Sequence, residues 1–290
     1  MKSAPFKYVP AESVDEVLAA LGEYGDEAKI LAGGQSLVPL MNMRLATPGV
    51  LVDVNRIRGL DGIKANGGLE IGAVTRQLAV QRSPDVESAA PMVTEALRHV
   101  GHTGIRSRAT FGGTIAHADP AAEIPAVLLA LEGEVVARGP GGERTIAADD
   151  LFVTYFTTTL AEYEMLTHAR IPKASDRLRF GFLEVARRHG DFALVGVAAA
   201  VEVDGGDVCQ SARIVIFGVG ERPIRALAGE QAVVGERLSD AAAQEAAARA
   251  TSAELEPKSD VHASSQYRKE VAGVLVRRAL VQAATRGEGR

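Results

Sequence analysis

The sequence predicts an α+β protein made of two parts. Segments typical of strands and helices alternate up to Pro172, a polar segment surrounds residue 176, and a hairpin pattern with two long helices completes the chain. Alternating strands and helices are typical of α/β architecture, whereas the hairpin indicates an antiparallel sheet. Because domain boundaries fall in polar connecting segments, we expect one domain over residues 1–176 and another over residues 177–290.

The first expected element is a helix that begins at Ser13. Ser13 and Glu16 have the spacing of a capping box, in which side chains accept hydrogen bonds from backbone N–H groups at the helix start. We expect Gly22 and Gly25 to end this helix. Apolar residues repeat on one helical face, namely Val14, Val17, Leu18 and Leu21.

The other elements of the first part are expected in the following order. Strands are predicted for residues 28–34, 50–57 and 68–74. Residues 86–100 are expected to form one helix, and residues 126–136 a helix that turns at Gly133 into a strand. Residues 164–172 are the last strand, which Pro172 ends because proline cannot donate to a β-ladder.

The second part is predicted to contain a hairpin and two helices. The apolar runs 193–203 and 212–220 are joined by the glycine-rich turn Asp204–Asp207. An alanine-rich helix near residues 239–255 and a long helix over residues 265–286 follow. The long helix carries apolar residues on one face, namely Val271, Val274, Leu275 and Ala279.

Composition excludes several classes of function. The 290 residues carry a net charge of −5 and no block of five or more basic residues, which argues against nucleic acid or an anionic membrane as the main partner. The segment Met1–Pro10 has no apolar core typical of a secretory signal, and the longest apolar run, residues 192–201, is too short to span a bilayer. The one cysteine, Cys209, cannot form an internal disulfide. We therefore expect a cytoplasmic protein without a transmembrane segment.

Two glycine pairs are the main candidates for a binding site. Gly33–Gly34 is followed by Ser36, and Gly112–Gly113 is followed by Thr114. Successive backbone N–H groups in such turns form a concave nest that binds anionic oxygens. Two nests suit a diphosphate, although either pair alone is also typical of an ordinary turn. The chain has neither a Gly-x-Gly-x-x-Gly fingerprint after a strand nor a P-loop.

Other candidate residues point less clearly to a site. His99 and His102 are spaced like metal ligands, but no third histidine or cysteine stands near, so a cap or surface role fits better. Cys209 lacks an accompanying histidine or aspartate motif and fits a strand residue better than a nucleophile. The segment Arg187–Phe192 precedes an apolar strand, and its arginines can be solvated or face a ligand. We expect no metal site and no catalytic residue in this chain.

Four segments together resemble a known family. They are LAGGQSLVPLMNMRLATP (residues 31–48), IRSRATFGGTIAHADPAAEIPA (105–126), EMLTHARIP (164–172) and QYRKEVAGVLVRRAL (266–280). These segments are similar to the flavin-binding motifs and last helix of the FAD-binding medium subunit of molybdenum hydroxylases. The pattern is that of the aerobic carbon monoxide dehydrogenase and xanthine dehydrogenase family, and it covers nearly the whole chain.

The resemblance implies a fold and a set of cofactor-binding residues. The implied fold is the vanillyl-alcohol-oxidase (PCMH) type, with two α/β subdomains divided near residues 55–60, followed by a small α+β domain with an antiparallel sheet and helices. In this family the first glycine pair lets the FAD diphosphate lie against the backbone, an acidic residue binds the adenosine ribose, and an aromatic residue lies near the isoalloxazine ring. The implied FAD-binding residues are Leu31, Ala32, Gly33, Gly34, Gln35, Ser36, Leu37, Gly101, Ile105, Thr110, Gly112, Gly113, Thr114, Asp119, Glu123, Leu166 and Phe192.

The chain departs from the family pattern at several of these positions. Gln35 replaces a frequent histidine and Thr114 a frequent asparagine or serine, and both keep a hydrogen-bonding side chain. Glu123 is one methylene longer than the common aspartate, and Phe192 lacks the hydroxyl group of the tyrosine in some relatives. Glu184 stands where several relatives have lysine, so that contact is not carried over.

The resemblance implies an electron-transfer function within a larger enzyme. FAD would receive electrons from two 2Fe–2S clusters on a small subunit, which are supplied by a molybdenum cofactor on a large molybdopterin-binding subunit, and pass them to an external acceptor. The resemblance implies a dimer of heterotrimers as the assembly, and the single cysteine of this chain cannot hold the clusters. The alternatives are a stand-alone FAD-dependent oxidoreductase of the vanillyl-alcohol-oxidase superfamily and a non-enzymatic scaffold, and the two glycine motifs argue against the latter.

Overall fold

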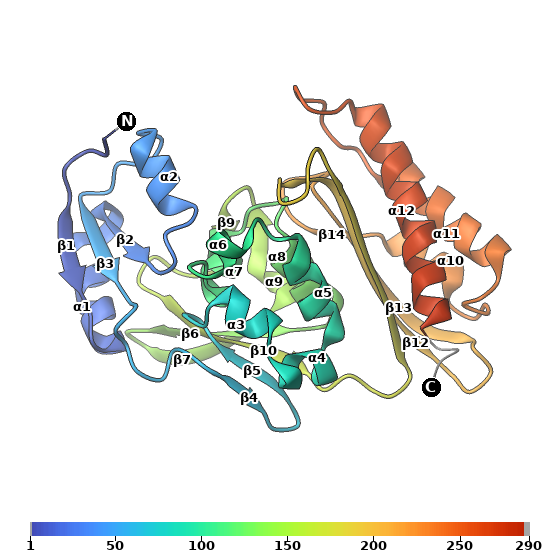
Figure 1. Cartoon of the computed structure of the whole chain (residues 1–290), viewed down its shortest axis with the longest axis horizontal. Coiled ribbons are helices and arrows are strands. Elements are labelled where there is room, and N and C mark those ends of the chain that lie inside the picture. The colour runs from blue at the N-terminus through green and yellow to red at the C-terminus, as the bar shows by residue number, and fades with distance from the viewer. Residues whose placement is uncertain (1, 287–290) are drawn as a thin grey trace.

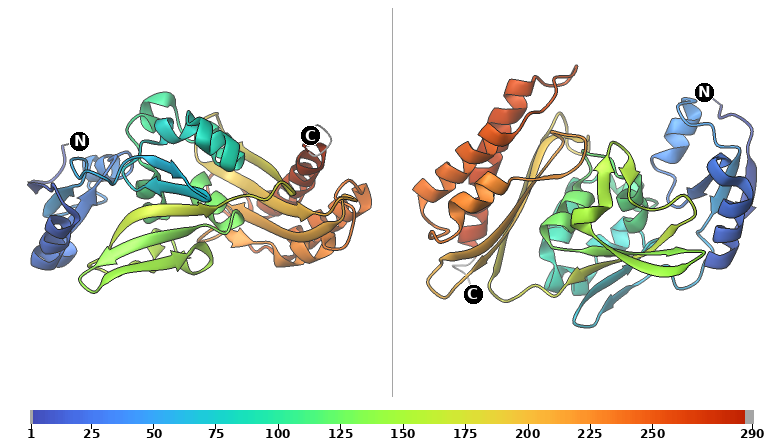
Figure 2. Two further views of the ribbon diagram at one scale, coloured as in Figure 1. Left: turned by 90° about the horizontal axis from the view of Figure 1, so that it is seen from below. Right: turned by 180° about the vertical axis from the view of Figure 1, so that it is seen from behind.

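The computed structural model describes residues 2–286 and contains three sheets of three or more strands, one after another along the chain. Figure 1 shows the N-terminal elements at the left, a central group of strands and short helices, and a long C-terminal sheet backed by helices at the right. Figure 2 shows from two further sides that the central group lies between the other two. The fold has helices and strands mixed throughout, in agreement with the α+β prediction.

The N-terminal unit is a small parallel sheet with helices. Its strands are β1 (Lys7–Pro10), β2 (Ala28–Leu31) and β3 (Val50–Asp53), in the order β1-β3-β2. Its helices are α1 (Val14–Tyr24), the 3-10 turn η1 (Gly25–Glu27) and α2 (Leu37–Asn42). Its core is made mainly of aliphatic residues, with Val17, Val52 and Val54 fully buried.

Helix α1 begins as the sequence predicts. The Ser13 side chain accepts a hydrogen bond from the Glu16 N–H at 3.2 Å, and the Glu16 carboxylate accepts one from the Glu12 N–H at 2.8 Å. Gly25 is the C-cap with a positive φ of 50°, but Gly22 lies inside the helix and does not end it. One glycine inside a helix costs about 1 kcal/mol, which the buried apolar face offsets.

The central unit is an antiparallel sheet with short helices inserted between its strands. The strand order is β4-β5-β10-β6-β7, and every neighbouring pair is antiparallel. The strands are β4 (Ile63–Ala65), β5 (Gly68–Gly72), β6 (Glu134–Gly139), β7 (Gly142–Ala147) and β10 (Met165–Pro172), with a separate hairpin β8 (Phe152–Thr154) and β9 (Thr157–Thr158). The helices are α3 (Gln77–Gln81), α4 (Pro84–Ala89), α5 (Pro91–His99), α6 (Thr103–Arg106), α7 (Phe111–His117), α8 (Glu123–Ala130) and α9 (Ala148–Leu151).

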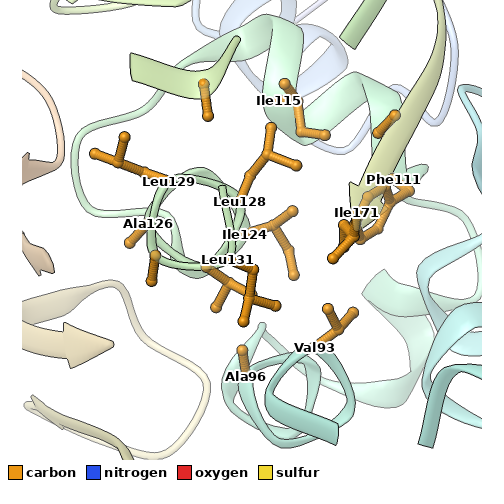
Figure 3. Close-up of a cluster of buried hydrophobic side chains, with 14 of the residues drawn as sticks. Val93, Ala96, Phe111, Ile115, Ile124, Ala126, Leu128, Leu129, Leu131 and Ile171 are labelled. Atoms are coloured by element: carbon orange, nitrogen blue, oxygen red, sulfur yellow. The ribbon is translucent and has the colours of Figure 1, made fainter. Parts of the chain in front are cut away.

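Helix α8 is the centre of the largest core. All eight of its residues are buried, as expected for a helix that is apolar on every side. Figure 3 shows its side chains Ile124 and Leu128 pointing toward Val93 of α5, Ile115 of α7 and Ile171 of β10. The strand predicted after Gly133 is β6, and Gly133 allows the turn to pack because a Cβ atom there would lie 2.3 Å from the Leu128 side chain.

The prediction of one continuous helix over residues 86–100 is wrong. The chain forms two helices, α4 and α5, which are separated at Ala90. Ala90 has φ of −148° and ψ of 68° because Pro91 follows it, and the proline ring disfavours a helical conformation for the preceding residue. Three strands are also shorter than predicted, since β2 ends at Leu31, β3 at Asp53 and β5 at Gly72.

The C-terminal unit is a four-stranded antiparallel sheet, β11-β12-β13-β14, with three helices. The strands are β11 (Leu178–Ala186), β12 (Ala193–Val203), β13 (Cys209–Phe217) and β14 (Ile224–Arg225), and the helices are α10 (Leu227–Val233), α11 (Ala241–Glu254) and α12 (Ser265–Thr285). The predicted hairpin is formed by β12 and β13, and both predicted helices are confirmed. The segment of residues 173–177 connects β10 to β11; its role as a domain boundary stays a prediction.

Strand β12 is buried on both faces, and its valines lie on one of them. The valines Val195, Val197 and Val201 belong to the core shared with α12, whereas Ala198 and Ala200 belong to the core around α8. Because successive side chains point to opposite faces of a sheet, the larger residues face the C-terminal helices and the smaller ones let α8 approach. The C-terminal sheet is therefore held between its own helices and the central unit.

Strand β11 was not predicted from the sequence. Its alternation is interrupted by two charged residues, Arg179 and Glu184, and the Glu184 side chain is only 4% exposed. A buried carboxylate in a strand is rare, so the pattern does not indicate a two-sided buried strand.

Among the described residues, no helix combines the length and apolar character needed to cross a membrane.

We expect Gly181→Ala to destabilise the fold, because a Cβ atom at this position in β11 would lie 2.1 Å from the Ala279 carbonyl oxygen of α12. Forcing extra volume into a packed contact costs about 1–3 kcal/mol. Thermal unfolding followed by circular dichroism should show a clearly lower midpoint than for Gly205→Ala, where a Cβ atom meets nothing within 4 Å. Equal midpoints for the two variants would contradict this account of the packing between β11 and α12.

Candidate cofactor-binding site

A cavity of about 460 Å³ lies where the three units meet. Its walls come from the loop between β2 and α2, the segment from the end of α5 through α7, the start of β10, and the loop between β11 and β12. A cavity of this size is typical of a small-molecule site. Its lining joins residues from both glycine motifs, which are about 80 positions apart in the sequence.

Most of the residues predicted to bind a cofactor line this one cavity. They are Ala32, Gly33, Gly34, Gln35, Ser36, Leu37, Gly101, Ile105, Thr110, Gly112, Gly113, Thr114, Glu123, Leu166 and Phe192. Leu31 is the last residue of β2 and lies outside the lining, and Asp119 lines a neighbouring cleft that shares Gly190, Asp191 and Phe192 with the cavity. Residues that were not predicted also line it, among them Lys29, Val54, Gln77, His117, Met165 and Asp191.

The loop that carries the first glycine pair presents unpaired backbone donors. No N–H group from Ala32 to Leu37 donates a hydrogen bond to another atom in the described part of the chain. Gly34 adopts a left-handed conformation with φ of 69°, and its carbonyl oxygen accepts the Val38 N–H at 3.1 Å as α2 begins. The loop is half-buried, and backbone N–H groups need acceptors once they are covered, so this loop has the capacity to bind an anionic group.

The second glycine pair differs from the prediction of a second nest. Gly112 and Gly113 lie in the first turn of α7, with Thr110 as N-cap. Their N–H groups and those of both neighbours already have acceptors. The bonds run from Phe111 to Thr75 O (2.9 Å), Gly112 to Ala73 O (2.9 Å), Gly113 to Thr110 Oγ1 (3.1 Å) and Thr114 to Thr110 O (3.2 Å). This segment can offer side-chain hydroxyl groups to a ligand, but not four free backbone donors.

Two of the four glycines are required for close contact between backbones. A Cβ atom on Gly33 would lie 2.5 Å from the Arg108 carbonyl oxygen and 2.7 Å from Ala109 Cα, and one on Gly112 would lie 2.6 Å from Ala73 Cα. No side chain fits at such distances. Gly33 therefore lets the first loop rest directly on the segment that leads into α7.

Asn55 and Arg76 hold these two segments together. The Asn55 amide donates to the Ala32 carbonyl oxygen at 2.9 Å, and the Arg76 Nη2 donates to Asn55 Oδ1 at 2.7 Å. The Arg76 Nη1 donates to the Arg108 carbonyl oxygen at 2.5 Å. Arginine presents several donors in a rigid fork, so one side chain joins both loops. Neither residue was predicted, because each is a single polar residue outside any motif.

Asp53 orients Asn55 by hydrogen bonding. Its carboxylate accepts hydrogen bonds from the Asn55 N–H at 2.8 Å and from the Tyr8 hydroxyl group at 2.5 Å. Partial burial raises the pKa of Asp53, but the hydrogen bonds from Tyr8 and Asn55 outweigh it and hold the pKa below its ordinary value. Asp53 is therefore ionised at neutral pH and fixes the side chain that supports the first loop.

Glu123 is the buried acidic residue of the cavity. It is the first residue of α8 and is 6% exposed. Burial, reinforced by the negative charge of Glu184, raises its pKa to about 8. The nearby Arg106 guanidinium does not neutralise it, because its donors bind the Val100 and Gly101 carbonyl oxygens and Gln81. Glu123 thus keeps hydrogen-bonding capacity for a bound molecule.

The other candidate residues, such as His102 and Cys209, lie outside the cavity lining. His102 is the N-cap residue of α6, and its ring stacks on His189 at 6.4 Å between centroids. Cys209 is a buried residue of β13, as predicted, and burial raises the pKa of its thiol to about 11. Within residues 2–286, no three histidine, cysteine or acidic side chains are placed to hold a metal ion together.

The chain matches two family models along nearly its whole length. Residues 4–174 match the FAD binding domain in molybdopterin dehydrogenase, and residues 181–283 match the CO dehydrogenase flavoprotein C-terminal domain. The 6-hydroxypseudooxynicotine dehydrogenase complex subunit alpha of Paenarthrobacter nicotinovorans is 41% identical over 98% of this chain and 96% of that protein.

Solved structures of related proteins have the same fold. A carbon monoxide dehydrogenase chain from Hydrogenophaga pseudoflava, in an enzyme that lacks the Mo-pyranopterin moiety of its cofactor, superposes with a TM-score of 0.95 at 36% identity and covers 99% of both chains. Quinoline 2-oxidoreductase from Pseudomonas putida 86 gives a TM-score of 0.92 at 35% identity, covering 98% of this chain and 99% of that chain.

The matched domains and the cavity define an FAD-binding subunit of an oxidoreductase. The chain belongs to the family of FAD-binding medium subunits of molybdenum hydroxylases, which includes carbon monoxide dehydrogenase medium chains. The residues present fit FAD, since the first loop has free backbone donors for a diphosphate and Glu123 has an uncommitted carboxyl group. The expected resemblance to this family is confirmed.

We expect Arg76→Met to weaken FAD binding by roughly tenfold, equivalent to about 1.4 kcal/mol, because the variant loses both hydrogen bonds that join the two loops. Fluorescence titration of the cofactor-free protein with FAD measures the change. Arg58→Met is the control, because Arg58 is an exposed arginine outside the cavity lining. If both variants bind FAD as tightly as the wild type, Arg76 does not organise the site.

Proposed function

We propose that FAD lies along the cavity with its diphosphate on the loop of residues 32–37. The run of unpaired N–H groups in this loop carries the proposal. Hydrogen bonds to a charged group stabilise binding by about 1.5–3 kcal/mol each. A diphosphate spreads its charge over several oxygens and can accept bonds from several consecutive donors, which a single carboxylate cannot do.

Three other residues of the cavity lining suit the two ends of FAD. Glu123 would bind the adenosine ribose, since its carboxyl group is buried in the lining and no side chain donates to it in the described part of the chain. Leu166 and Phe192 would lie near the isoalloxazine ring. Leu166 is buried and Phe192 is 63% exposed, so one residue supplies an apolar wall and the other an exposed aromatic ring. FAD supplies the electron-carrying chemistry, and the chain binds, orients and shields it.

The chain is further proposed to work as the middle subunit of a larger enzyme. Relatives are named as a complex subunit alpha and as medium chains. The one cysteine is buried in β13 and cannot hold an iron–sulfur cluster. Electrons would therefore arrive from 2Fe–2S clusters of a small subunit, supplied by a molybdopterin-binding large subunit, and leave to an external acceptor. A dimer of heterotrimers in the cytoplasm is the proposed assembly.

The purified chain should bind FAD non-covalently and become yellow. Gly34→Ala should weaken the affinity at least tenfold, because φ of 69° is unfavourable for alanine and the added Cβ would lie 3.1 Å from Val38. The control is Gly59→Ala, which imposes the same kind of backbone strain at φ of 85° away from the cavity. Absorption spectra after gel filtration with FAD measure retention, and equal retention by the two variants would refute the role of the loop.

The isolated flavoprotein should not oxidise an organic substrate. Mixed anaerobically with N-heterocycles, aldehydes or carbon monoxide, it should keep its oxidised flavin absorption, because the proposed function assigns substrate oxidation to the molybdopterin-binding subunit and the chain's one cysteine cannot hold an iron–sulfur cluster. The complex co-expressed with its iron–sulfur and molybdopterin subunits should lose that absorption with one of these substrates. Bleaching of the isolated chain at a comparable rate would instead support a stand-alone flavoenzyme.

A further inference from the structure

One side chain in the wall of the cavity has a polar atom without a partner. Gln77 is the first residue of α3, lines the cavity and is 1% exposed. Its side-chain Oε1 atom is fully buried and accepts no hydrogen bond in the described part of the chain. Gln77 belongs to neither glycine motif, so the sequence gave no reason to include it among the binding residues.

The position of this unpartnered atom separates it from similar atoms elsewhere. Among the described residues whose buried side-chain atoms lack a partner, Gln77 alone lines the cavity; the others are Thr94, Glu184, Thr251 and Arg268. A buried polar atom without a partner destabilises the folded chain, and most such atoms in native proteins do have one. At the wall of a binding cavity, the missing partner is a group that the ligand supplies.

The backbone around Gln77 holds it beside the first glycine loop. The Gln77 N–H donates to the Ala109 carbonyl oxygen at 2.9 Å. A Cβ atom on Gly33 would lie 2.7 Å from Ala109 Cα, so the first loop touches the same residue. Gln77 therefore lies next to the part of the cavity where the FAD diphosphate is proposed to bind.

The chemistry of the unpartnered atom indicates which part of FAD it faces. An amide oxygen accepts hydrogen bonds, so its missing partner is a donor. The ionised diphosphate has only acceptors and cannot be that partner. The ribityl chain, which is joined to the diphosphate, carries hydroxyl groups that both donate and accept. The last torsion of a glutamine side chain has two broad minima, so the amide of Gln77 can turn either its oxygen or its nitrogen to a hydroxyl group.

We propose that Gln77 is a cofactor-binding residue whose side-chain amide hydrogen-bonds a hydroxyl group of the ribityl chain of FAD. The inference rests on the proposed placement of the diphosphate on residues 32–37. In the cofactor-free chain the unpartnered amide oxygen destabilises the fold, and bound FAD supplies the missing donor. Gln77 therefore strengthens cofactor binding and weakens the stability of the free protein, a trade-off that binding sites often show.

The variant Gln77→Met tests both halves of this trade-off. Methionine is unbranched and fills a similar space without an amide group. The cofactor-free variant should unfold at the same or a higher temperature than the wild type, as followed by circular dichroism. Its affinity for FAD should fall by about five- to tenfold, because a net hydrogen-bond contribution is lost. Fluorescence titration measures this change, and Gln77→Leu provides a second removal of the amide.

Thr94→Val is the matched control. It also removes a buried oxygen without a partner, but from α5 and outside the cavity lining. The cofactor-free control should likewise unfold at the same or a higher temperature than the wild type, and its affinity for FAD should not change. ADP is the second probe, because it contains the diphosphate and adenosine but no ribityl chain. The wild type and Gln77→Met should bind ADP equally.

Three results would overturn the inference. They are a lower unfolding temperature of both cofactor-free Gln77 variants, which indicates a structural amide, equal FAD affinity of the wild type and these variants, and an equal loss of affinity for FAD and ADP. The first measurement needs no cofactor. A wild type that binds neither FAD nor ADP would overturn the proposed cofactor site itself, which distinguishes failure of that proposal from failure of the role of Gln77.

Discussion

The contact of the first glycine loop with the backbone at Arg108 and Ala109 is the constraint on which the site depends. Gly33 lies so close that a Cβ atom would be 2.5 Å from the Arg108 carbonyl oxygen. This approach brings the parallel N-terminal unit against the antiparallel central unit, and the cavity forms between them. Asn55 and Arg76 fix the contact by binding carbonyl oxygens on both sides.

The two glycine motifs consequently have different physical roles. The first loop keeps its N–H groups free, so it is the part that can bind an anion. The N–H groups of the second motif already donate to Ala73, Thr75 and Thr110, and Gly112 packs closely against Ala73. This motif is therefore a rigid support for the first loop. The C-terminal sheet adds the third wall, because packing of β12 against α8 places the loop of residues 187–192 over the cavity.

Much of this arrangement could be predicted from the sequence, and the reasons for the rest are physical. The capping box at Ser13, the hairpin of β12 and β13, and the last helix follow from local patterns. Asn55 and Arg76 could not be predicted, since their partners are carbonyl groups brought near only by the fold. The pattern of glycine pairs could not distinguish free from satisfied N–H groups. Strand β11 could not be predicted, because a charged residue such as Glu184 normally indicates an exposed face of a strand.

The central claim is that the loop of residues 32–37, and not the start of α7, supplies the backbone donors for FAD. Amide hydrogen exchange, measured by NMR with and without FAD, tests it most directly. The account predicts that the amides of Gly33 to Leu37 exchange rapidly in the free protein and become protected with FAD, whereas those of Phe111 to Thr114 are protected in both states. Unchanged exchange at residues 33–37, or protection at 111–114 that appears only with FAD, would contradict it.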